Sequence, residues 1–137
     1  MSTVTLRWVG SKLMTGMDSR GQSLVMGRWE ERDPTWQGLK PSDLLLLAAA
    51  SCSTWDLVTI LTKQRQPLQA LEVTCEGTQA SDPPHAFTAL HLHYAVHGSV
   101  APEKVERAIN LSLEKYCSVV NTLDSSVEVT TGFEIIG

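Results

Sequence analysis

The chain of 137 residues has little cysteine and no cluster of basic residues. Its three cysteines, Cys52, Cys75 and Cys117, are too few and too widely spaced for the disulfide framework of a small secreted protein. The 11 Lys and Arg residues are scattered and the net charge is −4, which argues against a nucleic-acid or acidic-membrane partner. A Gly-rich phosphate loop and a Ser/His/Asp order are also missing, so nothing indicates nucleotide binding or triad hydrolysis.

The N-terminal segment lacks the basic start and apolar stretch of a signal peptide. The longest apolar run, Leu44–Ala50, is shorter than the about 20 residues that cross a bilayer. We therefore expect a cytoplasmic protein, and in that compartment thiols stay reduced unless one has a redox or catalytic task.

The length and the apolar share of 42% fit one domain over residues 1–137. Period-two alternation and turn residues predict strands, and 3.6-residue periodicity predicts helices. The expected elements are a strand over Thr3–Val9, turns at Gly16 and Ser19–Gly21, a strand over Ser23–Met26, a loop over Glu30–Lys40, a helix from Pro41 to before Pro67, a hairpin of Leu71–Gly77 with His85–His97, a helix over Pro102–Tyr116 that continues through Cys117–Leu123, and a strand over Val127–Ile136.

The helix that opens at Pro41–Asp43 is apolar on every side in its first half. Pro suits the first turn, Ser can cap it, and Asp favours the positive end of the helix dipole. One small subunit cannot surround Leu44–Ala50 on all sides, so the sequence predicts that another subunit supplies part of the cover.

Taken alone, the cysteines leave two interpretations open. Cys52, on an apolar helix, and Cys75, alternating on a strand, are typical of small buried core residues. Cys117 lies where a helical segment starts, and the helix dipole there favours a thiolate.

The segment PSDLLLLAAASCSTWDLVTILTKQRQPLQALEVTCEG resembles the central helix and following strand of the OsmC/Ohr family (osmotically inducible protein C and organic hydroperoxide resistance protein). That family opens this helix with Pro and an acidic residue and then places its reactive Cys. FTALHLHYAVHG and PEKVERAINLSLEKYCSVVNTL look like its later strand, second helix and second Cys, closest to the YhfA-like branch. The resemblance implies an OsmC-like α+β fold, with antiparallel sheets wrapped around a long central helix in an intertwined homodimer.

The resemblance also implies a thiol-dependent peroxidase that reduces organic hydroperoxides without a metal or other cofactor. Cys52 would attack the peroxide, Cys117 would close a disulfide, and a dithiol, lipoyl-based in the family, would reduce it. Leu45, Leu46 and Trp55 would offer an apolar pocket for an alkyl tail. The alternative is a non-catalytic protein that binds a small apolar or reactive ligand or acts as a thiol redox sensor.

In the peroxidases of this family, a Glu directly after the helix-opening Pro and an Arg on the first hairpin orient the thiolate. The corresponding candidates here are Asp43 and Lys12, with Arg20 as a substitute for Lys12. On one straight helix Asp43 and Cys52 lie roughly 13 Å apart, so their contact requires a helix break or the partner's carboxylate.

Other polar residues suggest weaker sites. His91 and His93 share one face of a strand and could ligate zinc with Cys75 as a third ligand, but no fourth ligand is evident and a solvent-facing strand is the simpler interpretation. Asp56 and Lys63 are expected on a solvated helix face.

Overall fold

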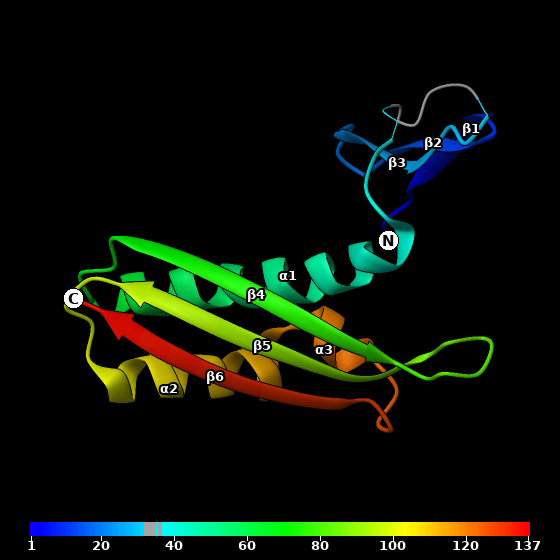
Figure 1. Ribbon diagram of the computed structural model, residues 1–137. Helices are drawn as coiled ribbons and strands as arrows, with labels where there is room; N and C mark the ends of the chain where they lie inside the picture. Colours follow the sequence, from blue (N-terminus) through cyan, green and yellow to red (C-terminus); the bar gives the residue numbers. More distant parts are fainter. Residues whose placement is uncertain (32–34, 36) are drawn as a thin grey trace. The chain divides into compact units, whose positions relative to one another are not determined.

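The computed structural model describes residues 1–31, 35 and 37–137. The chain forms two compact units, Met1–Leu45 and Leu46–Gly137. A 23-residue helix, α1 (Pro41–Lys63), starts in the first unit and runs through the second (Figure 1). It begins at the predicted residue and ends before Pro67, as the sequence indicated.

The first unit is a three-stranded antiparallel sheet in the order β1 (Thr5–Gly10), β2 (Lys12–Met17) and β3 (Ser23–Arg28). The prediction of a turn at Gly16 was wrong, because Gly16 pairs with Leu6 and Leu24 inside the sheet. The segment KLMTGM alternates too weakly to predict a strand, and only its pairing on both sides makes it one.

The loop expected over Glu30–Lys40 lies in part outside the described residues. Its described end runs alongside β3, where the Gly27 and Leu39 N–H groups donate to the carbonyls of Leu39 and Val25 at 2.9 Å each. Gly27 has φ +84°, a conformation that glycine adopts without strain, and a Cβ there would meet the Lys12 carbonyl.

The second unit contains a mixed sheet. β4 (Ala70–Gln79) and β5 (Phe87–His97) form the predicted antiparallel hairpin. β6 (Glu128–Ile136) pairs with β5 in the parallel direction, so the expectation of purely antiparallel sheets was wrong for this pair. The helical segment between β5 and β6 returns the chain to the starting end of β5, which makes a parallel pairing possible.

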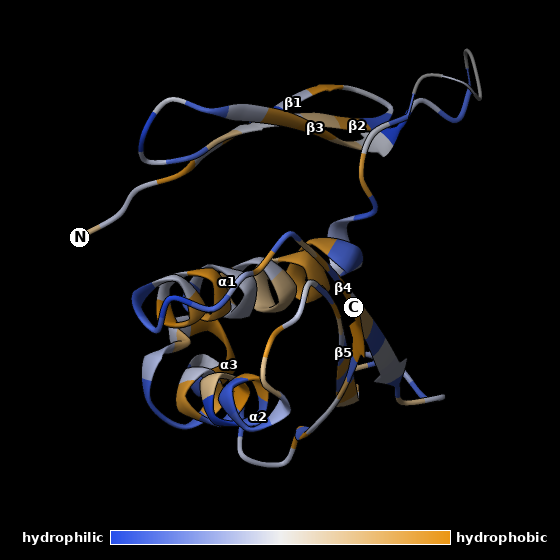
Figure 2. Cartoon of the chain, turned by 90° about the vertical axis from the view of Figure 1, so that its left-hand side faces the viewer, coloured by the Kyte–Doolittle hydropathy of each residue, from blue (hydrophilic) through white to orange (hydrophobic). Residues whose placement is uncertain are grey.

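The helices of the second unit lie against one face of this sheet (Figure 2). α1 turns Ala50, Ser53, Leu57 and Leu61 toward the sheet, at the spacing of three and four residues that puts side chains on one helix face. They meet the alternate β5 residues that point inward. The core comprises Ala50, Leu57, Leu61, Leu92, Tyr94, Val96, Val100, Val105, Ala108 and Ile109.

The second helical segment is interrupted at Cys117, the residue that the sequence placed at the start of a further helical run. α2 (Pro102–Leu111) passes into a π-helical turn over Ser112–Tyr116, and α3 (Ser118–Thr122) starts afresh. Cys117 between them is extended, with φ −74° and ψ 103°. The break is stabilised because the Cys117 N–H donates to the Ser112 carbonyl at 2.7 Å and its Sγ accepts from the Val120 N–H at 3.4 Å.

By length and composition α1 could cross a membrane, although its longest run without a polar residue is short. Serine and threonine lower the mean hydropathy of the helix only slightly, and cysteine is itself apolar, so the whole helix counts as apolar. Leu57 and Leu61 on this helix are 0% exposed against the sheet, which is the packing of a core helix in a small soluble α+β domain.

Candidate functional site

Cys52 and Cys117 are neighbours, and each thiol shifts the pKa of the other. Cys52 lies midway along α1, and Cys117 lies at the break before α3. Cys52 is partly exposed, whereas Cys117 is 0% exposed. Cys52 is therefore the more accessible of the two residues, and Cys117 lies in the interior.

The start of α3 lowers the pKa of Cys52. Burial is the largest single influence and by itself raises this pKa, but hydrogen bonds from the Val119 N–H, from the Cys117 thiol and from Ser118 together outweigh it. The Ser118 hydroxyl lies 3.9 Å from the Cys52 sulfur. Donors that bind a thiolate favour the charged form, so Cys52 ionises more readily than a free cysteine.

Cys117 has the opposite environment. Burial raises its pKa to about 11, and the neighbouring Cys52 sulfur adds to this rise. At neutral pH Cys117 is therefore a protonated thiol. The pair is divided into an ionisable outer thiol and a neutral inner one.

Cys75 takes no part in this pair. It lies opposite Leu92 on the inner face of the sheet, and burial raises its pKa. The alternative of a zinc site with Cys75 as third ligand does not fit this geometry, because His91 and His93 lie on the other face and bond to Thr130 and Glu134, at 2.7 and 3.3 Å. Among the described residues, no three His, Cys, Asp or Glu side chains gather as a metal site.

The other candidate residues, Lys12, Arg20 and Asp43, belong to the first unit. Lys12 forms an ion pair with Glu30 at 3.4 Å and lines a cavity of about 700 Å³ within that unit. Arg20 lies in the exposed turn after β2, where its N–H donates to Asp18 at 2.8 Å. Asp43 is exposed in the first turn of α1, which shows no break before Cys52.

Several residues of interest in the two units escaped the sequence interpretation. The Ser118 hydroxyl and the Val119 N–H become visible only with the helix break, which periodicity does not reveal. Asp56, expected on a solvated face, is half-buried and accepts from Ser112 at 2.8 Å. Glu30 was assigned to a loop and became a partner of Lys12 only through the pairing of β2 with β3.

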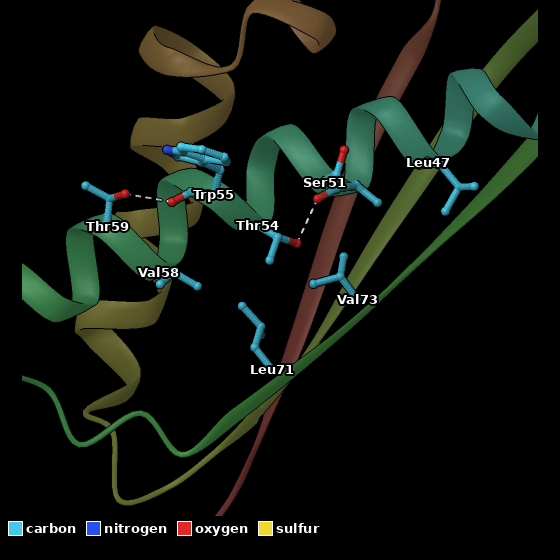
Figure 3. Close-up of a pocket in the computed structure, with 9 residues that line it drawn as sticks. Leu47, Ser51, Thr54, Trp55, Val58, Thr59, Leu71 and Val73 are labelled. Carbon is cyan, nitrogen blue, oxygen red and sulfur yellow. Dashed lines mark hydrogen bonds between the residues drawn. The ribbon is translucent and has the colours of Figure 1, made fainter. Parts of the chain in front are cut away.

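An open groove of about 530 Å³ runs between α1 and β4 (Figure 3). Figure 3 shows Trp55 and Val58 of α1 above Leu71 and Val73 of the strand. Trp55, one of the three residues expected around an alkyl tail, lines this groove, whereas Leu46 packs near Gly77. The groove is apolar and uncovered in the single chain.

Comparison with known proteins gives consistent matches over most of the chain. The family model "OsmC-like protein" matches residues 33–132. Protein YhfA of Escherichia coli K12 is 33% identical over 133 residues, which is 96% of each chain. A hypothetical protein from Aquifex aeolicus VF5 is similar in structure, with TM-score 0.88, 27% identity, and coverage of 99% of this chain and 96% of that one.

A more distant solved structure is described as an organic hydroperoxide resistance protein, OsmC, from Legionella pneumophila. It has TM-score 0.70 and 16% identity, and covers 98% of this chain and 96% of its own, which shows a shared fold. The two small sheets and the long helix agree with the family that the sequence suggested. The chain belongs to the OsmC-like family.

Proposed function

We propose that this protein is a cytoplasmic peroxidase that reduces organic hydroperoxides through Cys52 and Cys117. The proposal is supported by the pairing of a partly exposed thiol of lowered pKa with a neighbouring buried thiol whose pKa is raised to about 11. A two-cysteine peroxidase needs this division, because one sulfur must ionise and meet the peroxide while the other stays protonated until it is attacked.

The reaction would proceed in three balanced steps. The Cys52 thiolate attacks one oxygen of the hydroperoxide; the O–O bond breaks, the sulfur becomes a sulfenic acid, and the leaving alkoxide takes a proton to form an alcohol. The Cys117 sulfur then attacks the sulfenic sulfur, forming a disulfide and releasing water. A dithiol reductant, lipoyl-based by resemblance, finally reduces this disulfide by thiol–disulfide exchange.

The direct test is consumption of cumene hydroperoxide by the purified protein with dihydrolipoamide as reductant. We expect repeated turnover, with a rate that rises with pH until Cys52 is fully ionised, below the ordinary thiol range. If hydroperoxide oxidises the thiols once but is not consumed further in the presence of the reductant, this result would contradict the enzyme function and favour the sensor function.

We also propose that a second copy of the chain covers α1. Leu47, Trp55 and Val58 follow one another at helical spacing on its outer side and are 50%, 72% and 43% exposed. An apolar stripe of this kind on a single chain is typical of an interface with another chain. In the first unit, Leu6 and Trp8 of β1 are also exposed, at 60% and 69%.

Changing Trp55 to Glu should convert the dimer into a monomer or an unfolded chain, because the charge would be buried against apolar side chains. Light scattering at micromolar concentration measures this. Lys63→Glu, also exposed on α1 but on another side of the helix from the stripe, should leave the dimer intact. A wild-type chain that is a stable folded monomer would contradict the proposal.

For the polar partners of Cys52 we propose Lys12, with Arg20 as the substitute, and Asp43 from the partner chain. Lys12 is favoured over Arg20 because it lines a cavity, where it forms an ion pair with the Glu30 carboxylate. A cation near a thiolate lowers its pKa by roughly 1 unit or more.

Lys12→Ala should therefore raise the pH at which Cys52 reacts and slow its alkylation at neutral pH by up to about tenfold. The measurement is the rate of iodoacetamide labelling of Cys52 against pH. Arg20→Ala is the matched variant: an equal or larger shift in that protein would transfer the role to Arg20, and no shift in either would remove the cation from the mechanism.

A further inference from the structure

A chain of hydrogen-bonded polar side chains crosses the core of the second unit beside Cys117. The Tyr94 hydroxyl lies 2.6 Å from the Ser53 hydroxyl, and Ser112 Oγ lies 3.1 Å from Ser53 Oγ and 2.8 Å from Asp56 Oδ2. Tyr94, Ser53 and Ser112 are all 0% exposed. The chain joins β5, α1 and the π-helical turn.

Ser112 is the donor at the centre of this chain. A carboxylate only accepts, and a hydroxyl has a single proton to donate. Ser112 Oγ is placed to donate to Asp56 Oδ2 and to Ser53 Oγ, and its single proton serves one of these acceptors at a time. In the Ser53–Tyr94 pair either hydroxyl can donate, and the chain ends on the half-buried carboxyl group of Asp56.

Ser112 connects the two thiol-bearing segments. Its carbonyl accepts from the Cys117 N–H at 2.7 Å and so closes the π-helical turn. Its side chain is bound to Ser53, which directly follows Cys52, and to Asp56, one turn further along α1. A single residue therefore links the backbone of Cys117 to the helix that carries Cys52.

Stability alone does not account for these groups. Apolar residues of the same shape would fill the core about as favourably as a satisfied buried polar network, which carries a high cost when any member is lost. Isolated π-helical turns occur frequently at functional sites. Here the turn and the network share Ser112.

We propose that Ser112 is a positioning residue that holds Cys117 against Cys52, so that the disulfide between them closes rapidly. The proposal rests on the proposed thiol chemistry, but it concerns the closure of the disulfide and is independent of the oxidant that begins it. Tyr94, Ser53 and Asp56 act by fixing Ser112.

Ser112→Ala should slow closure of the Cys52–Cys117 disulfide by about tenfold, since a lost hydrogen bond to a charged group is of this size. It should also raise the pH midpoint of Cys52 alkylation, because the donors at the start of α3 would be displaced. Thr88→Ala is the control: it removes an exposed hydroxyl, bonded to the Thr78 carbonyl at 3.3 Å, from the same strand as Tyr94.

Closure is measured on the full-length protein with diamide, which takes two electrons and two protons from the thiol pair, and separately with cumene hydroperoxide. If hydroperoxide fails to oxidise the wild type but diamide closes the disulfide quickly, the peroxidase proposal fails and the diamide rates still test Ser112. A merely structural role would lower the melting temperature and leave the pH midpoint unchanged.

Asp56→Ala and Asp56→Asn carry the test if Ser112→Ala does not fold. Alanine removes the acceptor and should slow closure, whereas asparagine keeps an oxygen for Ser112 and should restore most of the rate. Closure and a pH midpoint equal to those of Thr88→Ala, in folded Ser112→Ala or in Asp56→Ala, would overturn the proposal. Asparagine as slow as alanine would also overturn it, by assigning the effect to charge.

Discussion

Replacing Cys52 by serine should reduce hydroperoxide consumption to the uncatalysed background, a loss on the order of 10³-fold or more. A serine hydroxyl does not ionise at neutral pH, so the nucleophile disappears while the shape of the side chain is kept. The measurement is cumene hydroperoxide consumption with dihydrolipoamide, on protein whose melting temperature and oligomeric state match the wild type.

Cys75→Ser is the matched control for this loss. Cys75 is a partly buried thiol on the inner face of β4, and burial raises its pKa. Its variant should retain most of the activity. Retained turnover in Cys52→Ser, or equal losses in both variants, would contradict the assignment of Cys52 as the attacking residue.

Two substitutions of Cys117 should separate its two tasks. Cys117→Ser should stop turnover after one hydroperoxide, because no disulfide can form, and should leave a sulfenic acid on Cys52. The serine hydroxyl can still donate to the Cys52 thiolate, so the pH dependence of the first attack should change little. Cys117→Ala removes that donor as well and should shift the midpoint of Cys52 alkylation to higher pH.

Dimedone trapping of the sulfenic acid and the alkylation rate against pH measure these outcomes. Full turnover in Cys117→Ser would show that the reductant attacks the Cys52 sulfenic acid directly. An unchanged alkylation midpoint in Cys117→Ala would show that the inner thiol does not stabilise the outer thiolate.

The sequence predicted the long helix and the central hairpin because their signals are local. The Pro41–Asp43 start, the alternation along His85–His97 and the prolines between the two strands each act within a few residues. The direction of β6 could not be predicted, because strand pairing depends on where the preceding helices return the chain.

The site was predicted in part. The two cysteines were singled out through their family contexts, and each of these neighbouring thiols shifts the pKa of the other. The π-helical turn before Cys117 was not predicted, because Ser112–Thr122 contains no proline or glycine to mark an irregularity. The groups that tune Cys52 are mainly backbone N–H donors, which every residue carries and which no sequence pattern singles out.

The Asp56–Ser112–Ser53–Tyr94 chain shows a further limit. Its members are separated by up to 59 residues, as for Ser53 and Ser112, and each one alone is an ordinary polar residue. Asp56 in particular has the spacing of a solvated helix face. Only the packing of α1 against the π-helical turn brings these groups together.

The most direct test of the two-cysteine reaction is peptide mapping of the reduced protein after one equivalent of t-butyl hydroperoxide. With free thiols blocked before digestion, mass spectrometry should find the peptides of Cys52 and Cys117 joined by a disulfide, and Cys75 blocked as a free thiol. Three blocked thiols after this treatment, or a disulfide that includes Cys75, would contradict the mechanism.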